Sequence, residues 1–331
     1  MKNISKILKV MVLGALTFSV SNCDDNDDNV VLPTTKTIAG IASSSNDFST
    51  LVSALNKTGL TATLNSSGNY TVFAPTNAAF DTFLMDNGFD SLNDVPVDLL
   101  KEVLLNHVVR GELFSSQLST TYVKTLAKGA ASSTNTLSLY VDTTSGVKLN
   151  GVATVTKANL DASNGVVHVV DAVIGLPTIV THATANPNFS ILVAALTRTD
   201  QLDQNFVSTL AGTANSPFTV FAPTNTAFSN TSTPLGLLQE FSWATLNDVP
   251  ETVLEKTLKY HVVLNANVLS NNLPTSPVTT YLGQTFTISN TGGGPIITDY
   301  NSRISNIVAT DVQCSNGVIH VVNKVIVPNL N

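Results

Sequence analysis

The body of this 331-residue chain repeats itself, and this feature limits its fold more than any other. Residues 71–80 recur at 219–228 with nine identities in ten, and residues 164–170 recur at 316–322 with one change. The motifs keep their order while the spacing between them varies by a few residues, as in two copies of one fold with loop insertions. The sequence therefore predicts a tandem duplication of a single domain.

The repeat also sets the predicted domain boundaries. A domain of roughly 150 residues buries enough apolar surface to fold without disulfides or metals. A boundary near residue 177 separates the last strand pattern of one copy from the first helix pattern of the next. We predict a first copy over residues 37–177 and a second copy over 178–331, preceded by two short segments, 1–22 and 23–36.

Apolar periodicity predicts both helices and strands in each copy. Apolar residues within 48–55 and 189–196 recur at i, i+3, i+4 and i+7, which is one face of an amphipathic helix. Residues 71–73 form a β-branched and aromatic run that a proline terminates, and Thr76 or Asn77 can then cap a helix. The repeated motif is therefore a strand-to-helix corner in an α+β domain.

Two further patterns extend this expectation. Pro96 can begin a helix whose buried stripe continues to His107, and the matching stripe of the second copy ends at His261. Residues 166–174 are apolar at both parities, so we expect a strand that is covered on both faces.

Four of the five histidines form two duplicated pairs, His107 with His168 and His261 with His320. Each lies among valines or leucines on a predicted strand or helix stripe. A metal site or an acid–base pair would need carboxylates or a nucleophile nearby, and the sequence around these histidines supplies none. We interpret them as buried, hydrogen-bonded structural side chains. His182 lies in the linker and has no motif around it.

No sequence motif predicts catalysis, a cofactor or a metal. Nucleophile elbows, zinc-protease helices, phosphate-binding loops and dinucleotide fingerprints are all missing from the sequence. Residues 292–294, three glycines before a proline, indicate a hairpin turn. Cys314 precedes a buried strand at the position that Ala162 occupies in the first copy, which favours a small buried side chain. We predict that the protein is not an enzyme.

The charge composition argues against nucleic acid as a partner. The chain has 16 Lys+Arg against 23 Asp+Glu, a net charge of −7, and no basic cluster outside its N-terminus. Phosphate binding requires such a cluster. Charged residues make up only 12% of the chain, so Ser, Thr and Asn must cover most of the surface, which suits an exported protein.

The N-terminus is interpreted as an export signal followed by a tether. Three lysines precede an uncharged apolar run at 10–20, which is too short to span a bilayer but typical of a signal peptide. Residues 20–23, Val-Ser-Asn-Cys, resemble the lipobox of bacterial lipoproteins, which implies cleavage and acylation at Cys23. Ordinary secretion with an unmodified Cys23 is the alternative. Residues 24–29 carry four aspartates and no apolar side chain, so they form either an acidic surface-export tether or a plain spacer.

The two duplicated motifs resemble the two signatures of fasciclin-like domains. Residues 71–80 and 219–228 are similar to the first signature, and residues 164–177 and 316–328 to the second. The resemblance covers the chain from about residue 37 to its end. It implies two wedge-shaped α+β domains, each with two packed β-sheets flanked by helices, serving adhesion or extracellular interaction without a cofactor.

The resemblance also suggests where binding would occur. Adhesive members of the family use a Tyr-His motif and an Asp-aliphatic pair, which Tyr260-His261 and Asp311-Val312 match here. The first copy differs at both places, with Asn106-His107 and Asn159-Leu160. We therefore predict binding through the second copy; the alternative is that Tyr260 and Val312 are packing residues. The single tryptophan, Trp243, lies in an insertion of the second copy, residues 229–245, and is a further candidate.

Together these observations predict a lipid-anchored protein of the bacterial cell envelope, surface-exposed or periplasmic, that acts by binding. The leading function is adhesion to an extracellular or surface protein. The alternative is binding of a polysaccharide, although one tryptophan and six tyrosines offer few aromatic platforms for sugars. Membrane contact would occur only through acyl chains at Cys23.

Overall fold

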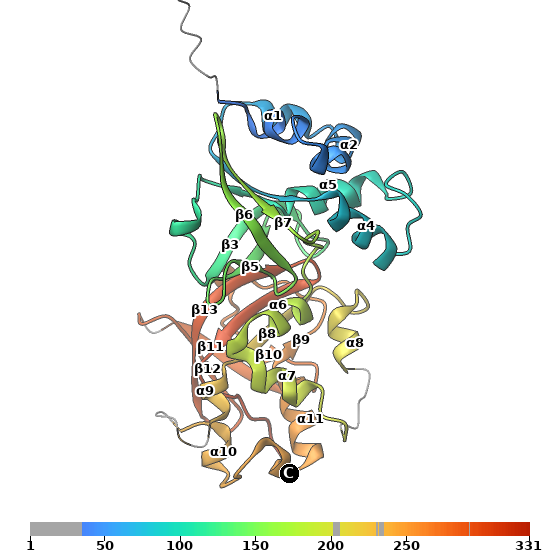
Figure 1. The fold of residues 1–331 in the computed structure, drawn as a ribbon. Helices are drawn as coiled ribbons and strands as arrows, with labels where there is room; N and C mark the ends of the chain where they lie inside the picture. Colours follow the sequence, from blue (N-terminus) through green and yellow to red (C-terminus); the bar gives the residue numbers. More distant parts are fainter. Residues whose placement is uncertain (1–34, 201–205, 230, 232–234, 291) are drawn as a thin grey trace, which may run out of the picture. The chain divides into compact units, whose positions relative to one another are not determined.

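The computed structural model describes residues 35–331 except 201–205, 230, 232–234 and 291. Residues 35–331 form one compact unit that contains both copies. The predicted signal peptide and Cys23 lie outside the described residues, as does most of the predicted tether. Both copies are α+β, as predicted, and each contains seven strands flanked by helices (Figure 1).

The first copy forms a closed barrel with helices beside it. Its helices are α1 (Ile38–Ser43), α2 (Ser49–Thr58), α3 (Thr61–Asn65), α4 (Asn77–Asp86) and α5 (Val97–Leu105), with the 3-10 helices η1 (Asn46–Phe48) and η2 (Ser115–Gln117). Its strands are β1 (Tyr70–Pro75), β2 (Val108–Arg110), β3 (Thr121–Lys128), β4 (Thr136–Asp142), β5 (Lys148–Leu149), β6 (Ala153–Ala162) and β7 (Gly165–Val170). Strand β1 is parallel to β7 and antiparallel to β2, and the pair Val109 and Thr125 links β2 to β3 and closes the barrel.

The second copy has the same strand order but stays open. Its helices are α6 (Ile179–Ala185), α7 (Ser190–Leu196), α8 (Phe206–Ala211), α9 (Asn225–Phe228), α10 (Leu237–Glu240) and α11 (Glu251–Tyr260), with η3 (Pro187–Phe189), η4 (Leu246–Asp248) and η5 (Ser270–Asn272). Its strands are β8 (Phe218–Pro223), β9 (Val262–Val263), β10 (Val278–Thr279), β11 (Thr285–Asn290), β12 (Pro295–Thr298), β13 (Ile304–Cys314) and β14 (Gly317–Val322). Strands β9 and β10 are the two edges of this sheet. The hairpin between β11 and β12 contains the glycines of 292–294, as predicted.

The strand-to-helix corner forms as the sequence predicts. Strand β1 ends at Pro75, and Thr76 is the N-cap of α4, with its side-chain oxygen accepting a hydrogen bond from the Ala79 amide at 3.3 Å. This hydrogen bond satisfies one amide that the first helical turn leaves without a partner. The capping residue is therefore Thr76, and Asn77 is the first helical residue.

Two predicted boundaries were too long. The strand expected over residues 166–174 ends at Val170, although every residue of β7 is buried as predicted. Helix α5 ends at Leu105, so His107 lies just beyond the helix and not on its stripe. The cause is the same in both cases: the apolar pattern continues after the chain has left the regular element, because the residues that follow are also buried.

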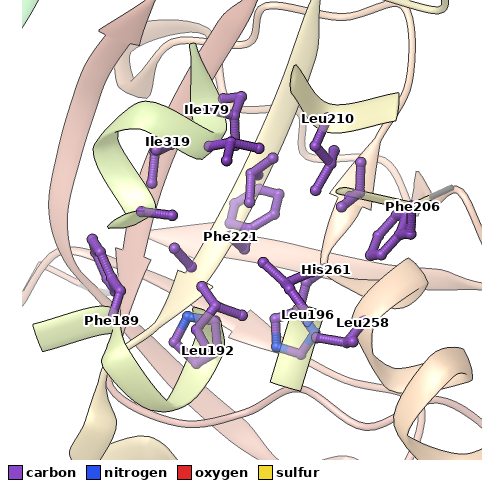
Figure 2. A pocket seen from close by; sticks show the side chains of 16 residues that line it. Ile179, Phe189, Leu192, Leu196, Phe206, Leu210, Phe221, Leu258, His261 and Ile319 are labelled. Carbon is purple, nitrogen blue, oxygen red and sulfur yellow. The ribbon is translucent and has the colours of Figure 1, made fainter. Parts of the chain in front are cut away.

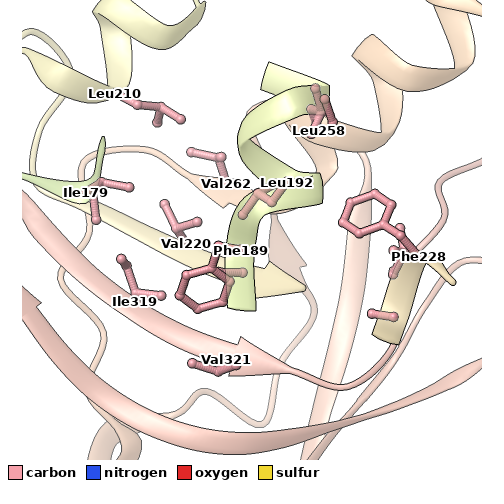
Figure 3. Packing of buried hydrophobic residues seen from close by; sticks show 14 of the residues in the cluster. Ile179, Phe189, Leu192, Leu210, Val220, Phe228, Leu258, Val262, Ile319 and Val321 are labelled. Carbon is pink, nitrogen blue, oxygen red and sulfur yellow. The ribbon is translucent and has the colours of Figure 1, made fainter. Parts of the chain in front are cut away.

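Each copy has two apolar clusters. One fills the space between helices and sheet, and the other lies between strands. Figure 3 shows the first kind in the second copy, where Leu192 from α7 meets Val220 of β8 and Ile319 of β14. In Figure 1, helices α1, α2, α4 and α5 gather beside the strands of the first copy in the corresponding way.

Candidate functional site

His107 and His261, which correspond to each other in the two copies, each connect the end of a helix to the segment after the last strand. The Ile174 amide donates to His107 Nε2 at 2.9 Å, so Nδ1 carries the proton and donates to the Val103 carbonyl at 2.7 Å. His261 does the same with Thr257 and Ile326, at 2.7 and 3.1 Å. Burial lowers the pKa of both imidazoles to about 4. Both rings are therefore neutral at pH 7, with both nitrogens in use.

His168 and His320, which also correspond to each other, each hold a loop against the central strand of their copy. His168 Nε2 donates to the Leu113 carbonyl at 2.9 Å, and its Nδ1 accepts from the Asn159 amide at 3.2 Å. His320 Nε2 donates to the Val268 carbonyl at 2.8 Å. Burial lowers the pKa of both rings. This geometry fits the predicted structural role of His107, His168 and His320 and gives it a specific form, because each ring joins main-chain groups that are distant in sequence.

Asp311 and Asn159 have the same structural role in the two copies, although one side chain is a carboxylate and the other an amide. Both have positive φ, 61° and 63°, within irregular stretches of β13 and β6. Asp311 accepts from the Ser270 amide at 2.8 Å and from the Ser270 hydroxyl. Asn159 accepts from the Ser115 amide at 2.8 Å and donates to the Ser115 hydroxyl at 2.9 Å. Each residue therefore fastens a 3-10 helix, η5 or η2, to the strand.

The Tyr-His motif and the residue after Asp311 are buried in the described structure. Tyr260 has no exposed surface, and its hydroxyl donates to the Thr285 carbonyl at 2.7 Å and accepts from the Tyr300 amide at 3.2 Å. His261 and Val312 are 3% and 4% exposed. Of the two predicted motifs, only Asp311 reaches the surface, and it does so partly.

Trp243 is partly buried against the core of the second copy and stacks on Phe241, with ring centroids 4.8 Å apart and planes 11° apart. Phe241 is 38% exposed. The insertion that carries both rings is fastened by ion pairs, because Glu240 contacts Arg303 and Lys324. The first copy has the same helix-ending turn, with Phe89 in the place of Trp243 but Asn87 in the place of Phe241, so the partly exposed aromatic pair is particular to the second copy although the turn that carries it is not.

An apolar cavity lies between helices and sheet in the second copy (Figure 2). Its volume is about 30 Å3, far below the roughly 150 Å3 of an apolar cavity that admits benzene. His261 is its polar lining side chain, next to Leu196 and Leu258 in Figure 2, and its ring nitrogens are already bonded. We interpret the cavity as a packing gap.

A polar cluster lies where the two copies meet, and no sequence motif marks it. Lys124 of β3 donates to the Asp311 carbonyl at 2.7 Å and to the Ser138 hydroxyl at 3.0 Å. That hydroxyl also accepts from the Gln313 amide at 3.0 Å. His182 is fully buried here against Tyr122. The repeat contains one indication of this cluster. The first copy has Tyr122 and Lys124 where the second has Pro277 and Thr279 at the corresponding positions.

The described residues contain no group of three or more His, Cys, Asp or Glu side chains that could hold a metal ion. Cys314 is fully buried, as predicted, and burial raises the pKa of its thiol. No helix within the described part of the chain has the length and apolar character needed to cross a membrane.

Comparison with known proteins agrees with the fold. The Fasciclin domain family model matches residues 46–177 and 187–328, which together are more than half of the chain. A Synechocystis sp. protein is 34% identical over 167 residues, covering 49% of this chain and 88% of that protein. Periostin of Homo sapiens is 27% identical over 79% of this chain, which spans only 29% of periostin.

Two further comparisons involve a fungal protein and a solved structure. A fasciclin-like arabinogalactan protein of Arthroderma benhamiae is 28% identical over 80% of this chain and 60% of its own length. The FAS1 domain pair from the insect cell adhesion molecule Fasciclin I superposes with a TM-score of 0.50 at 19% identity, over 86% of this chain and 97% of that one.

Proposed function

Because the chain belongs to the fasciclin domain family, we propose that it is a cell-envelope lipoprotein whose two domains act as a non-catalytic adhesion and interaction module. The observation that carries this proposal is the use of the duplicated histidines. In both copies each ring bonds at least one main-chain group, and burial lowers the pKa of every one of these rings. Residues committed in this way serve the fold, which leaves recognition to surfaces where the copies differ.

The second copy offers the surface that differs most. Phe241 stacks on Trp243 at a turn where the first copy has Asn87 and Phe89, and aromatic side chains of this kind dominate binding hot spots. Asp311 lies apart from this aromatic pair, towards the end of β13 that meets the first copy, where it holds η5 in place. Tyr260, His261 and Val312 are buried and would act by stabilising the fold of the second copy.

A binding screen with aromatic variants tests this assignment. The full chain is measured against immobilised fibronectin, type I collagen and a panel of purified glycans. For any probe that binds, Phe241→Ala and Trp243→Ala should each weaken affinity roughly tenfold or more. Tyr300→Ala is the matched control, because Tyr300 is 56% exposed on another loop of the same copy, and its affinity should stay within about twofold. An equal loss in all three variants would contradict the assignment.

The lipid anchor has a separate test. We propose that Cys23 carries the acyl chains, since the segment before it has the pattern of a lipoprotein signal. The wild-type protein should then fractionate with membranes, because two or more acyl chains anchor stably where one does not. Cys23→Ser should move the chain out of the membrane fraction and leave its signal segment uncleaved. If the variant is processed and anchored like the wild type, the protein is not a lipoprotein.

Binding of a neutral polysaccharide is a second candidate, and a depression in the second copy favours it. All of its lining side chains are uncharged, and most carry hydroxyl or amide groups: Ser270, Asn271, Leu273, Pro274, Thr275, Ile288, Ser289, Asn290, Pro295 and Thr310. Hydroxyl and amide groups over an apolar floor suit a neutral sugar chain. In the glycan panel, Asn271→Ala would then weaken binding to neutral but not to acidic glycans, while protein probes would bind unchanged.

A further inference from the structure

The contact between the two copies buries a histidine whose ring has no hydrogen bond. His182 of α6 is fully buried, and Tyr122 of the first copy packs edge-on against it with ring centroids 5.3 Å apart. Neither ring nitrogen has a hydrogen-bond partner. The other four histidines each bond main-chain groups, whereas the main-chain groups of Ser138 and Gln313 lie near the His182 ring without a hydrogen bond of normal geometry. We call the contact of Tyr122, Lys124 and Ser138 with His182 and Gln313 the domain junction.

The first copy provides an internal reference for this burial. Ile41 of α1 occupies the position that corresponds to His182, and no domain covers that end of the described first copy; Ile41 is only partly buried. Asp161 corresponds in the same way to Gln313, and it is exposed where Gln313 is 1% exposed. The contact between the copies, and not the fold of one domain, therefore removes His182 from water.

The charges around the ring oppose its protonation. Strand β3 contributes Lys124 and the neutral Tyr122, and Lys124 adds to the effect of burial; together they lower the pKa of His182 to about 3. The main-chain groups of Ser138 and Gln313 offset only part of this. The remaining ionisable groups on strands β3, β4, β13 and β14 are Lys128, Tyr140, Asp142, Asp311, Cys314 and His320. Within the described residues no carboxylate acts on His182; Asp311 acts on Lys124 and His320 instead.

We propose that the domain junction is an acid-sensitive latch: it stays closed while His182 is neutral, and it opens when His182 takes up a proton. A cationic ring beside the Lys124 ammonium has no countercharge in the closed junction, whereas water can solvate it once α6 and β13 separate from β3 and β4. Opening would free the two domains to move independently and would expose Tyr122 and Gln313.

The direction of the pH effect follows from the pKa difference. In the open junction the pKa of His182 returns towards 6.5, and in the closed junction it is about 3, so the open form binds more protons throughout this window. The opening constant therefore rises about tenfold for each pH unit lost between these values. From pH 7 to pH 4.5 the expected increase is roughly 75-fold.

Amide hydrogen exchange on the full chain measures this opening directly. The Gln313 amide donates to Ser138 across the junction, and the Ala131 amide donates to the Ser315 carbonyl across it at 3.0 Å. Their protection should fall roughly 75-fold from pH 7 to pH 4.5, after correction for intrinsic rates, and should stay below that of the amides of the central strands β1 and β8 at every pH. Unchanged protection of the junction amides over this range, or protection equal to that of the central strands at every pH, would overturn the proposal, because equal protection means that the junction exchanges only by global unfolding.

Two variants identify the titrating group. His182→Ile installs the residue found at the corresponding first-copy position, and His182→Gln keeps a polar but non-titrating side chain. Both should hold the loss of Gln313 protection below about threefold over the same pH range. If both keep the wild-type loss, another group controls the junction and the proposal fails. Should neither variant fold, the wild type still decides the question: acid opens the latch if the Gln313 and Ala131 amides lose protection between pH 7 and pH 4.5 while staying less protected than the central strands.

Discussion

At one pair of corresponding positions, Asn159 and Asp311, the two copies form equivalent hydrogen bonds with different residues. At another pair, Asn106 and Tyr260, both the residues and their hydrogen bonds differ. Asn159 and Asp311 both fasten a 3-10 helix through two hydrogen bonds to a serine. Asn106 and Tyr260 do not match in this way. Asn106 Nδ2 bonds the Gly175 carbonyl at 2.9 Å, whereas the Tyr260 hydroxyl reaches the Thr285 carbonyl and the Tyr300 amide. A difference in residue type at a motif position therefore does not show a difference in structure until the hydrogen-bond partners of each side chain are known.

The copies differ most where they face outward. The first copy closes its barrel and covers His182 with Tyr122, while the second leaves its sheet open and presents Phe241, stacked on Trp243, where the first copy has Asn87. The interior hydrogen bonds are nearly identical. Asn164 and Asn316, for example, each accept from the first helix of their copy and donate to two carbonyls at the C-terminal end of a later helix. Divergence at surfaces over a common interior is what two domains with separate binding tasks require.

The largest expected effect tests the Asn106 and Tyr260 difference. Tyr260→Ala removes a fully buried aromatic ring and leaves two main-chain groups without partners, so it should cost about 3–5 kcal/mol. Asn106→Ala removes a smaller side chain and should cost about 1–2 kcal/mol. Urea unfolding of each full-length variant measures both values. Similar costs for the two variants would show that the packing and hydrogen bonds of Tyr260 stabilise the fold no more than those of Asn106.

The next prediction concerns the histidines that behave alike. His168→Ala and His320→Ala each strand a buried carbonyl and leave a void, which should cost about 2–4 kcal/mol in either copy. Calorimetry should therefore show a lower Tm for the altered domain in both variants. A normal Tm combined with a lost bound metal or a lost activity would overturn the structural role.

The pH dependence of stability should also be shared. The pKa of His107 and His261 is about 4 in the folded chain, below the ordinary 6.5, so folding favours the neutral ring. Stability is therefore constant above pH 6.5 and falls as the pH drops towards 4, by at most about 1.4 kcal/mol per pH unit for each histidine. Urea midpoints at pH 7, 5.5 and 4.5 measure the slope. His107→Gln should lower the stability at pH 7 but flatten the slope of its own domain, and an unchanged slope would exclude His107 as a source.

The repeat and the apolar periodicity predicted much of the interior, because local sequence controls it. The cap at Thr76 and the burial of β7 depend on neighbouring residues, and both could be predicted. The burial of His182 depends on the contact between copies, and no pattern around His182 carries that information. Tyr260 raised another difficulty: its motif suggested a surface role, but its position at the end of α11 directs the ring into the sheet.

The smallest expected effect tests whether Asn159 and Asp311 are equivalent. Asp311→Asn keeps an oxygen for the Ser270 amide and supplies an NH2 group for the Ser270 hydroxyl, and Asn159→Asp makes the reverse exchange at Ser115. Both residue types tolerate the positive φ of these positions. Each exchange should therefore change the free energy of unfolding by less than about 1 kcal/mol. Alanine at either position loses the hydrogen bonds to the serine and strains the backbone, which should cost about 1–3 kcal/mol. If Asp311→Asn abolishes binding to a partner at unchanged stability, the carboxylate itself contacts that partner, and the two copies differ at this position in function and not in fold.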